Sequence, residues 1–445
     1  MKPRWINLGS AGILFVGLLL FDLPAEAPLE KHVEQMFPPR AFAQTRSIFN
    51  VRDFGARGDD AADDTAAIQR TVNAASDGAT IYFPPGIYQV SNFFVRNRSR
   101  LSFVGEGETS IIKQKTGAPR IATFEQVRDM TITKLAFDAN GILKYGGVAF
   151  YASSGVRIEN NRFFDNAPKP AHSGDHYSIV FGKGPTPSRD IKIVNNTIDD
   201  LQLEVDHSQN VLIEGNTVRR ALNTAGIGIF TIGDNAVAED YLIKGNTLID
   251  PPKLGFTVEL DPPTTNYCSF RRIAIIGNRI IRTKTGGRGI LIGTPDNSKP
   301  TVGNVFEDIT IKDNVMRIES DAPQPGPMIF ANASARSAIT FQRLIISGNR
   351  FENKATANIG YAIDLRRVQN STVADNHIAG ATSGIALSGE LSANDVRGNV
   401  VEAAEIAYRL DSSLGGNRAA NNRMLGSPRQ PWILSNLKPS DAIER

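Results

Sequence analysis

The chain has 445 residues, of which 41% are apolar and 21% charged, with 49 basic and 46 acidic residues and a formal net charge of +3. This composition can bury a core and excludes a disordered chain, and the near balance of charge excludes a strongly basic nucleic-acid binder. A single cysteine, Cys268, excludes an intrachain disulfide framework and a cysteine-cluster metal site. The 39 Gly and 24 Pro indicate many turns, as all-β chains need.

The N-terminal residues are typical of a targeting segment. Lys2 and Arg4 precede an apolar run over 11–21, which has the length of a signal-peptide core. A small-x-small cleavage motif ends at Ala27, but Pro28 follows at once, so an uncleaved membrane anchor is the alternative. We therefore predict a signal peptide or anchor over 1–27, a linker over 28–46, and a protein that is secreted, periplasmic or at the cell surface.

The segment 49–88 carries the most specific pattern in the chain. It predicts a strand, a Gly/Asp turn, a helix and a second strand that ends in a Pro-Gly turn. Asp63 or Asp64 is placed to cap the helix, and Ile68 and Val72 belong to its apolar stripe. Such a helix cannot bury this stripe alone, so we expect it to cover the open end of a larger structure.

This segment resembles the opening of the pectate-lyase superfamily, which is shared with glycoside-hydrolase-28-like and related proteins. The matching runs are Asp53-Phe-Gly-Ala-Arg-Gly58-Asp, Asp63-Asp-Thr-Ala-Ala-Ile-Gln69 and Phe83-Pro-Pro-Gly86-Ile-Tyr88, with Asp60 where glycine is common. The resemblance implies an all-β fold, a right-handed parallel β-helix with an N-terminal capping helix. We place this domain at 47–425 and a C-terminal tail at 426–445.

A short unit, apolar-x-x-Asn-x-apolar, supports a solenoid independently. Its asparagines are separated by 29 residues on average, a spacing typical of solenoid coils. Asparagine tolerates the left-handed conformation, so we expect each one to form a tight corner and to hydrogen-bond its neighbours in a structural ladder. The members are Asn161, Asn196, Asn216, Asn246, Asn278, Asn314, Asn349, Asn376, Asn399 and Asn422.

Another strand in each repeat alternates apolar and charged residues. If its apolar residues point inward, the charged ones share one outer sheet face, where coils stack about 4.8 Å apart. The charged positions are Glu204, Asp206, Glu259, Asp261, Asp364, Arg366, Arg409 and Asp411. The first four form two Glu-x-Asp pairs, which we expect to lie about two coils, or ~10 Å, apart with Gly228 as an open floor between them.

Paired carboxylates suit glycosidic hydrolysis, because one can donate a proton while the other activates water or attacks the sugar. The catalytic candidates are therefore Glu204, Asp206, Glu259 and Asp261. Two histidines, His176 and His207, are the base candidates for a lyase or epimerase, in which a bound Ca²⁺ would neutralise a uronate. Further substrate-binding candidates are Tyr151, Asp175, Lys183 and Phe230, the two aromatic residues by stacking on sugar rings.

Three functions stay open at this point. We favour an enzyme that cleaves a long, acidic polysaccharide, by hydrolysis before lyase or epimerase chemistry, with no cofactor apart from Ca²⁺ in the lyase case. The alternative from another class is a non-catalytic glycan-binding scaffold, in which the outer charges are solvated surface. The catalytic signatures of polygalacturonases, mannuronan epimerases and the best-known pectate lyases do not occur in the sequence. The sequence does not indicate an oligomeric state.

Overall fold

The computed structural model describes residues 47–141, 147–166, 177–182, 184–222, 224–250, 256–262, 265–283, 288–294, 301–319, 327–333, 339–354 and 360–445. The predicted targeting segment and linker lie outside these residues, as do His172, Asp175, His176 and Lys183. Among the described residues, no helix is long and apolar enough to cross a membrane.

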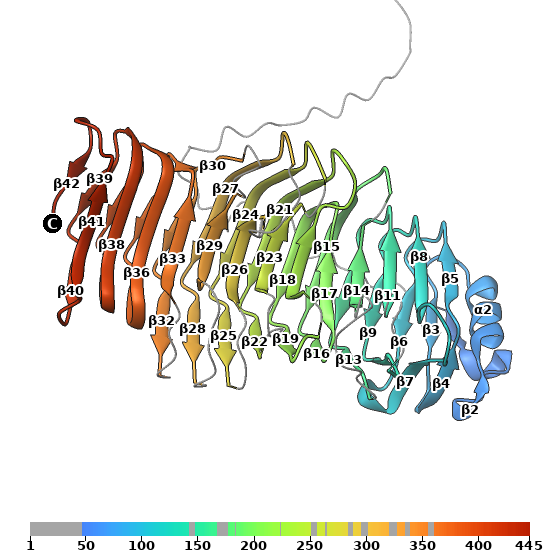
Figure 1. Cartoon of the computed structure of the whole chain (residues 1–445). Helices are drawn as coiled ribbons and strands as arrows, with labels where there is room; N and C mark the ends of the chain where they lie inside the picture. The colour runs from blue at the N-terminus through green and yellow to red at the C-terminus, as the bar shows by residue number, and fades with distance from the viewer. Residues whose placement is uncertain are drawn as a thin grey trace, which may run out of the picture.

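The described chain winds into a stack of coils, in which the strands of one coil pair in parallel with those of the next (Figure 1). The strands form three sheets, and each coil passes through sheet III, sheet I and sheet II in that order. The predicted right-handed parallel β-helix is confirmed.

Sheet I consists of β5 (Phe93–Arg96), β8 (Ala122–Glu125), β11 (Val148–Tyr151), β14 (Tyr177–Phe181), β17 (Gln202–Val205), β20 (Ala225–Phe230), β23 (Phe256–Asp261), β26 (Arg288–Gly293), β29 (Ile329–Asn332), β33 (Tyr361–Arg366) and β41 (Gln430–Ser435). Sheet II consists of β1 (Ile48–Asn50), β3 (Thr80–Tyr82), β6 (Ser102–Val104), β9 (Thr131–Thr133), β12 (Arg157–Glu159), β15 (Ser188–Val194), β18 (Ser208–Glu214), β21 (Val237–Lys244), β24 (Ser269–Ile276), β27 (Val305–Lys312), β30 (Phe341–Gln342), β31 (Ile345–Ser347), β34 (Val368–Gln369), β35 (Thr372–Ala374), β37 (Asp395–Arg397), β39 (Arg418–Ala420) and β42 (Ala442–Ile443).

Sheet III consists of β2 (Asp59–Asp63), β4 (Gly86–Val90), β7 (Ser110–Gln114), β10 (Ala136–Asp138), β13 (Arg162–Phe164), β16 (Thr197–Asp199), β19 (Thr217–Arg219), β22 (Thr247–Ile249), β25 (Arg279–Arg282), β28 (Val315–Ile318), β32 (Arg350–Asn353) and β40 (Arg423–Leu425). Two long strands, β36 (His377–Ser392) and β38 (Val400–Gly415), each pair with strands of sheets III and I. The last strands, β41 and β42, pair with β38 and β39, so the coils continue past residue 425, where the sequence predicts their end.

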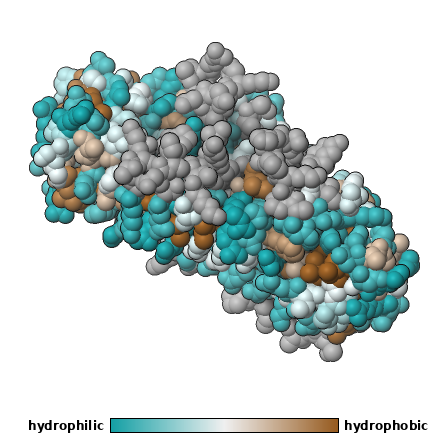
Figure 2. Space-filling view, turned by 60° about the horizontal axis from the view of Figure 1, so that its bottom comes forward, coloured by the Kyte–Doolittle hydropathy of each residue, from teal (hydrophilic) through white to brown (hydrophobic). Residues whose placement is uncertain are grey.

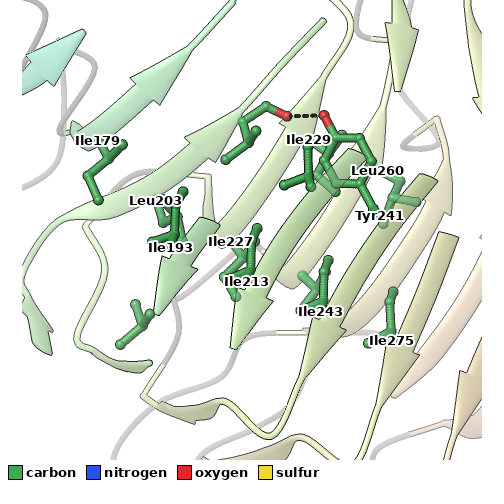
Figure 3. Packing of buried hydrophobic residues seen from close by; sticks show 14 of the residues in the cluster. Ile179, Ile193, Leu203, Ile213, Ile227, Ile229, Tyr241, Ile243, Leu260 and Ile275 are labelled. Atoms are coloured by element: carbon green, nitrogen blue, oxygen red, sulfur yellow. Dashed lines mark hydrogen bonds between the residues drawn. The ribbon is translucent and has the colours of Figure 1, made fainter. Parts of the chain in front are cut away.

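The interior is filled by rows of identical or similar apolar side chains. Ile193, Ile213, Ile243 and Ile275 are register partners on successive strands of sheet II, and they form one row inside the stack (Figure 3). Each is fully buried, because alternation along the strand points every second residue inward. Each coil therefore buries its apolar face only against its neighbours, which is how a solenoid gains a continuous core.

The asparagine ladder runs beside these rows. In the middle of the ladder, the side-chain amide and backbone N–H of Asn216 both donate to Oδ1 of Asn246, at 3.0 and 2.9 Å, and Asn246 makes the same contacts to Asn278. The predicted ladder thus exists. The predicted corner conformation is one residue off, because the left-handed φ belongs to the preceding residue, such as Gly215 or Gly245. This leaves the asparagine side chain free to turn inward.

One α-helix covers the N-terminal end of the stack, as the sequence predicts. This helix, α2, spans Thr65–Ala74 and buries Ile68 and Val72 against the core (Figure 1). The two aspartates before the helix have different partners. Asp63 Oδ1 accepts the Thr65 N–H at 3.0 Å, whereas the carboxylate of the buried Asp64 accepts the N–H groups of Arg57 and Gly58. Two 3₁₀ turns, η1 (Val51–Phe54) and η2 (Gly107–Thr109), complete the described helical residues.

Candidate active site

The two Glu-x-Asp pairs lie on the outer side of sheet I, two coils apart. Glu204 on β17 is the register partner of Gly228 on β20, and Gly228 is the partner of Glu259 on β23. The second row is parallel to the first: the Phe230 N–H donates to Asp206 Oδ1 at 2.7 Å, and Phe230 is the register partner of Asp261. At about 4.8 Å per coil, the backbone positions of the two pairs are therefore ~10 Å apart.

The four carboxylates are buried, so they do not form the solvated surface that the alternative interpretation of these charges describes. Glu204 and Asp206 are 1% and 0% exposed, and Glu259 and Asp261 are each 4% exposed. Alternation places them on the outer side correctly, since the residues between them, such as Leu203 and Leu260, belong to the core. Alternation along one strand predicts the side on which a residue lies, but not how far that residue is buried.

The floor between the two pairs is covered, not open. A Cβ added to Gly228 would overlap the ring of Phe230 and would lie 3.0 Å from Gln202 Nε2. The Phe230 ring therefore folds back along β20 over Gly228, and Phe230 is itself only 9% exposed. In this conformation Phe230 is a cover over the carboxylates and does not present its ring face as a stacking platform.

The N-terminal pair, Glu204 and Asp206, is supplied with hydrogen-bond donors. Gln202 Nε2 donates to Glu204 Oε2 at 2.8 Å, and the backbone N–H of Phe230 donates to Asp206. Donors of this kind favour the ionised form of a carboxyl group. The sequence analysis did not predict a role for Gln202, although Gln202 lies two residues before Glu204 and therefore on the same side of the strand as Glu204 and Asp206.

The C-terminal pair, Glu259 and Asp261, has fewer hydrogen-bond donors among the described residues. Glu259 Oε2 and Asp261 Oδ1 are buried without a hydrogen-bond partner among these residues, and the buried hydroxyl of Thr231 lies one residue beyond the register partner of Asp261, also without such a partner. Burial raises the pKa of Asp261 to about 8. Burial, together with the negative charges of Asp261 and Glu204, raises the pKa of Glu259 well above its usual value, although Arg288 opposes this. Burial therefore favours the protonated form of both Glu259 and Asp261.

His207 is held by the backbone of the adjoining coils. Its Nδ1 accepts the N–H of Val237 at 3.0 Å, and a further hydrogen bond joins it to the backbone of Pro185. Burial lowers the pKa of the imidazole. Both ring nitrogens therefore have backbone partners, and this arrangement suits a neutral histidine that positions the loop after β17.

Apolar clusters flank the carboxylates along sheet I. On the N-terminal side, Tyr151 packs with Ala149, Tyr177 and Val180, and the Arg120 guanidinium lies 5.8 Å from the Tyr151 ring centroid. On the C-terminal side, Leu291 and Phe330 occupy the next two positions of the row that contains Glu259. Hydrophobic residues gather in separate patches on a mostly hydrophilic face of the molecule (Figure 2).

The other outward charges of sheet I pair along their own strands. Arg366 Nη2 donates to Asp364 Oδ2 at 3.2 Å, and Arg409 Nη2 donates to Asp411 Oδ2 at 3.1 Å. Since residues two apart on a strand share a face, each arginine can reach the aspartate nearest to it.

The described residues contain no group of three or more His, Cys, Asp or Glu side chains that could hold a metal ion. Cys268, the single cysteine, is fully buried, and its Sγ lies 3.2 Å from the hydroxyl of Thr265. Its N–H donates to Asn304 Oδ1 at 2.8 Å, so this residue has a structural role directly before β24 of sheet II.

Two family matches cover separate parts of the chain. Residues 48–246 match the family described as "Rhamnogalacturonase A/epimerase, pectate lyase-like", and residues 328–431 match "Periplasmic copper-binding protein (NosD)". Copper binds thioether and imidazole donors that converge, yet the described candidates in 328–431 are divided: Met328 and Met424 pack with the core, and His377 lies on sheet III. These residues do not fit a copper site.

Similarity to curated proteins is confined to short stretches. The chain is 37% identical over 108 residues to "Mannuronan C5-epimerase AlgE3" and 36% identical over 108 residues to "Alginate lyase 7", both of Azotobacter vinelandii. These stretches cover 21% of this chain but only 6% and 13% of the two relatives. A probable glucan endo-1,3-beta-glucosidase of Arthroderma benhamiae is 47% identical over 53 residues, 9% of this chain and 6% of that protein.

Solved structures share the fold over most of the chain. The surface adhesin PfbA of Streptococcus pneumoniae has a TM-score of 0.59 at 18% identity and matches 79% of this chain and 90% of its own. An exopolygalacturonase from Thermotoga maritima has a TM-score of 0.57 at 14% identity, with 90% and 96% covered. At this identity the likeness shows the fold alone, and it confirms the predicted resemblance to pectin-lyase-like proteins.

Proposed function

Starting from a pectin-lyase-like parallel β-helix, we propose that the protein is a polysaccharide-acting enzyme that hydrolyses glycosidic bonds between the Glu204/Asp206 pair and the Glu259/Asp261 pair. The observation that carries this proposal is the difference between the two pairs across two coils. Glu204 and Asp206 accept hydrogen bonds from Gln202 and Phe230, whereas burial raises the pKa values of Glu259 and Asp261, for which the described residues supply no such donor.

The chemistry follows from this division. A protonated carboxyl group, Glu259 or Asp261, donates its proton to the leaving glycosidic oxygen, while an ionised one, Glu204 or Asp206, takes a proton from the attacking water. Inverting glycosidases separate these groups by roughly 6.5–9.5 Å and retaining ones by about 5–5.5 Å. A separation of two coils, ~10 Å at the backbone, favours inversion.

Access to the carboxylates requires the Phe230 ring to leave its place over Gly228. Once turned outward, the ring would lie between the two pairs and could stack on a sugar ring, as the sequence predicts. Tyr151 on one side and Phe330 on the other extend the same sheet, so a polymer would lie along the coils with its scissile bond over β20. Such a protein would act at the cell surface or outside it, which agrees with the predicted targeting segment.

The test is digestion of neutral and uronate polysaccharides, followed by a reducing-end assay and by absorbance at 235 nm. Hydrolysis gives reducing ends without 235 nm absorbance, and NMR of the first product gives its anomeric configuration. Glu204→Gln and Glu259→Gln should each abolish cleavage, whereas Asp364→Asn, in the same row but paired with Arg366, should not. Full activity of Glu259→Gln would contradict the proposal.

A lyase or epimerase is the second candidate, favoured by the short matches to mannuronan epimerases and an alginate lyase. It needs a base such as His176 and, for a lyase, Ca²⁺ to neutralise a uronate. Absorbance at 235 nm that disappears with EDTA would establish this reaction in place of hydrolysis. The third reading, a glycan-binding scaffold, requires binding without any product in either assay.

A further inference from the structure

Gln202 occupies the buried floor beside the N-terminal pair. It lies on β17 two residues before Glu204, is fully buried and shares the outer side of the strand with Glu204. Its register partner in the preceding coil is Tyr177. A buried polar side chain at this depth needs hydrogen bonds, and those of Gln202 define its orientation.

Three contacts fix the side-chain amide of Gln202. Its Oε1 accepts the backbone N–H of Ala225 at 3.1 Å and lies 3.3 Å from the hydroxyl of Thr224. A backbone N–H can only donate, so the amide oxygen must face β20. The NH₂ group must then face Glu204, where Nε2 lies 2.8 Å from Oε2. The orientation of the amide is therefore set by the main chain of the next coil.

We propose that Gln202 is a positioning residue that holds Glu204 ionised and oriented, so that Glu204 is the base that activates water. This inference rests on the proposed function, because it assigns one role within that reaction. Gly228 is part of the arrangement, since a side chain there would crowd the Gln202 amide, only 3.0 Å from its Cβ position.

Two further acids share the outer side of the sheet with Glu204. Asp206 follows on the same strand, and Glu259 lies two coils away and interacts electrostatically with Glu204. The register partners of Glu204 itself are Val180 and Gly228. A negative charge on Glu204 is therefore stabilised by the NH₂ group of Gln202 against the charges of the two neighbouring acids.

The sharpest variant is Gln202→Glu, which keeps an oxygen for the Ala225 N–H but replaces the donor with a second acid. If the proposal holds, the acidic limb of the kcat/KM profile moves at least one pH unit upward, because the new pair shares a proton. Gln202→Leu should move the limb in the same direction. The matched control is Gln209→Glu on β18, whose amide donates to Glu239 at 3.3 Å outside the site and should not move the profile.

A second measurement needs no activity. In the full chain labelled with ¹³C at the glutamate carboxyl, the Glu204 signal, assigned by its loss in Glu204→Gln, should titrate at higher pH in Gln202→Leu than in the wild type. An unchanged titration overturns the proposal. If the signal shifts but no polysaccharide is cleaved, the proposed function fails while the Gln202–Glu204 coupling stands. If cleavage occurs with an unmoved pH profile, the hydrolase stands and Gln202 is only structural.

Discussion

The asparagine ladder and the carboxylate site are both stacks of buried polar side chains along the axis of the coils, yet they differ in one respect. The side chain of Asn216 is fully hydrogen-bonded, since its amide donates to Asn246 and its oxygen accepts from Asn196. Glu259 and Asp261 retain oxygens without a donor among the described residues. Buried polar groups with complete hydrogen bonding stabilise a fold, whereas incomplete bonding costs stability and marks groups kept for chemistry.

The largest effect should come from Glu259→Gln. The amide cannot donate an acidic proton, so we expect kcat to fall about 10³-fold, within the range that general acid catalysis contributes. Because Gln fills the same space, the melting temperature should stay near that of the wild type. Initial rates with the best polysaccharide, together with thermal unfolding, check both parts. A large loss of stability would show instead that Glu259, like the ladder asparagines, stabilises the fold.

The ladder should respond in the opposite way to Asn216→Ala. In a fully buried position, this change removes the acceptor of the Asn196 N–H, one acceptor of the Asn196 amide and the side-chain donor to the carbonyl of Ile193. The free energy of unfolding should fall by about 3 kcal/mol, measured by denaturant titration. Asn422→Ala, at the partly exposed end of the ladder, is the control and should lose less than half as much. Equal losses would show that burial of the ladder does not matter.

The pH dependence of stability separates the two regions further. Burial raises the pKa of Asp261 to about 8 from an ordinary value of 3.8, so the folded state binds more protons than the unfolded state between these values. This contribution to stability is fully present below pH 4 and is lost as the pH rises towards 8, by an amount on the order of several kcal/mol. Denaturant unfolding from pH 4 to 9 should show this loss in the wild type and much less of it in Asp261→Asn. Parallel curves for the two proteins would contradict it.

The smallest effect is expected at the outer ion pairs of sheet I. Asp364 and Arg366 form a single pair near the surface, and such pairs contribute about 0–1 kcal/mol. Asp364→Asn should therefore change the free energy of unfolding by at most about 0.5 kcal/mol, with activity retained. A large change in either quantity would extend the site three coils beyond Glu259.

The fold could be predicted because its signals are local and repeated. The opening motif specifies the cap and first coils, and one asparagine per coil marks the period; only the position of the left-handed residue was misjudged by one, because asparagine and glycine both tolerate it. The site was harder. Alternation assigned Glu204 and Glu259 to the outer side, but it could not show that they are buried or that the Phe230 ring folds back over Gly228 between them. Gln202 could have been found by the same alternation.

The ladder also determines how the spacing of the two carboxylate pairs can change. Every inner ladder amide donates to the asparagine of the next coil and to a backbone carbonyl of the preceding one, so each inner coil presents the same donors and acceptors to its neighbours. A whole coil can therefore be removed or inserted without changing any ladder contact. The distance between Glu204 and Glu259 can consequently change only in steps of about 4.8 Å, the spacing of one coil. Loss of the single coil that carries Gly228 would bring the acids to about 5 Å, the spacing of a retaining enzyme, so stereochemical outcome in this scaffold is a matter of coil number.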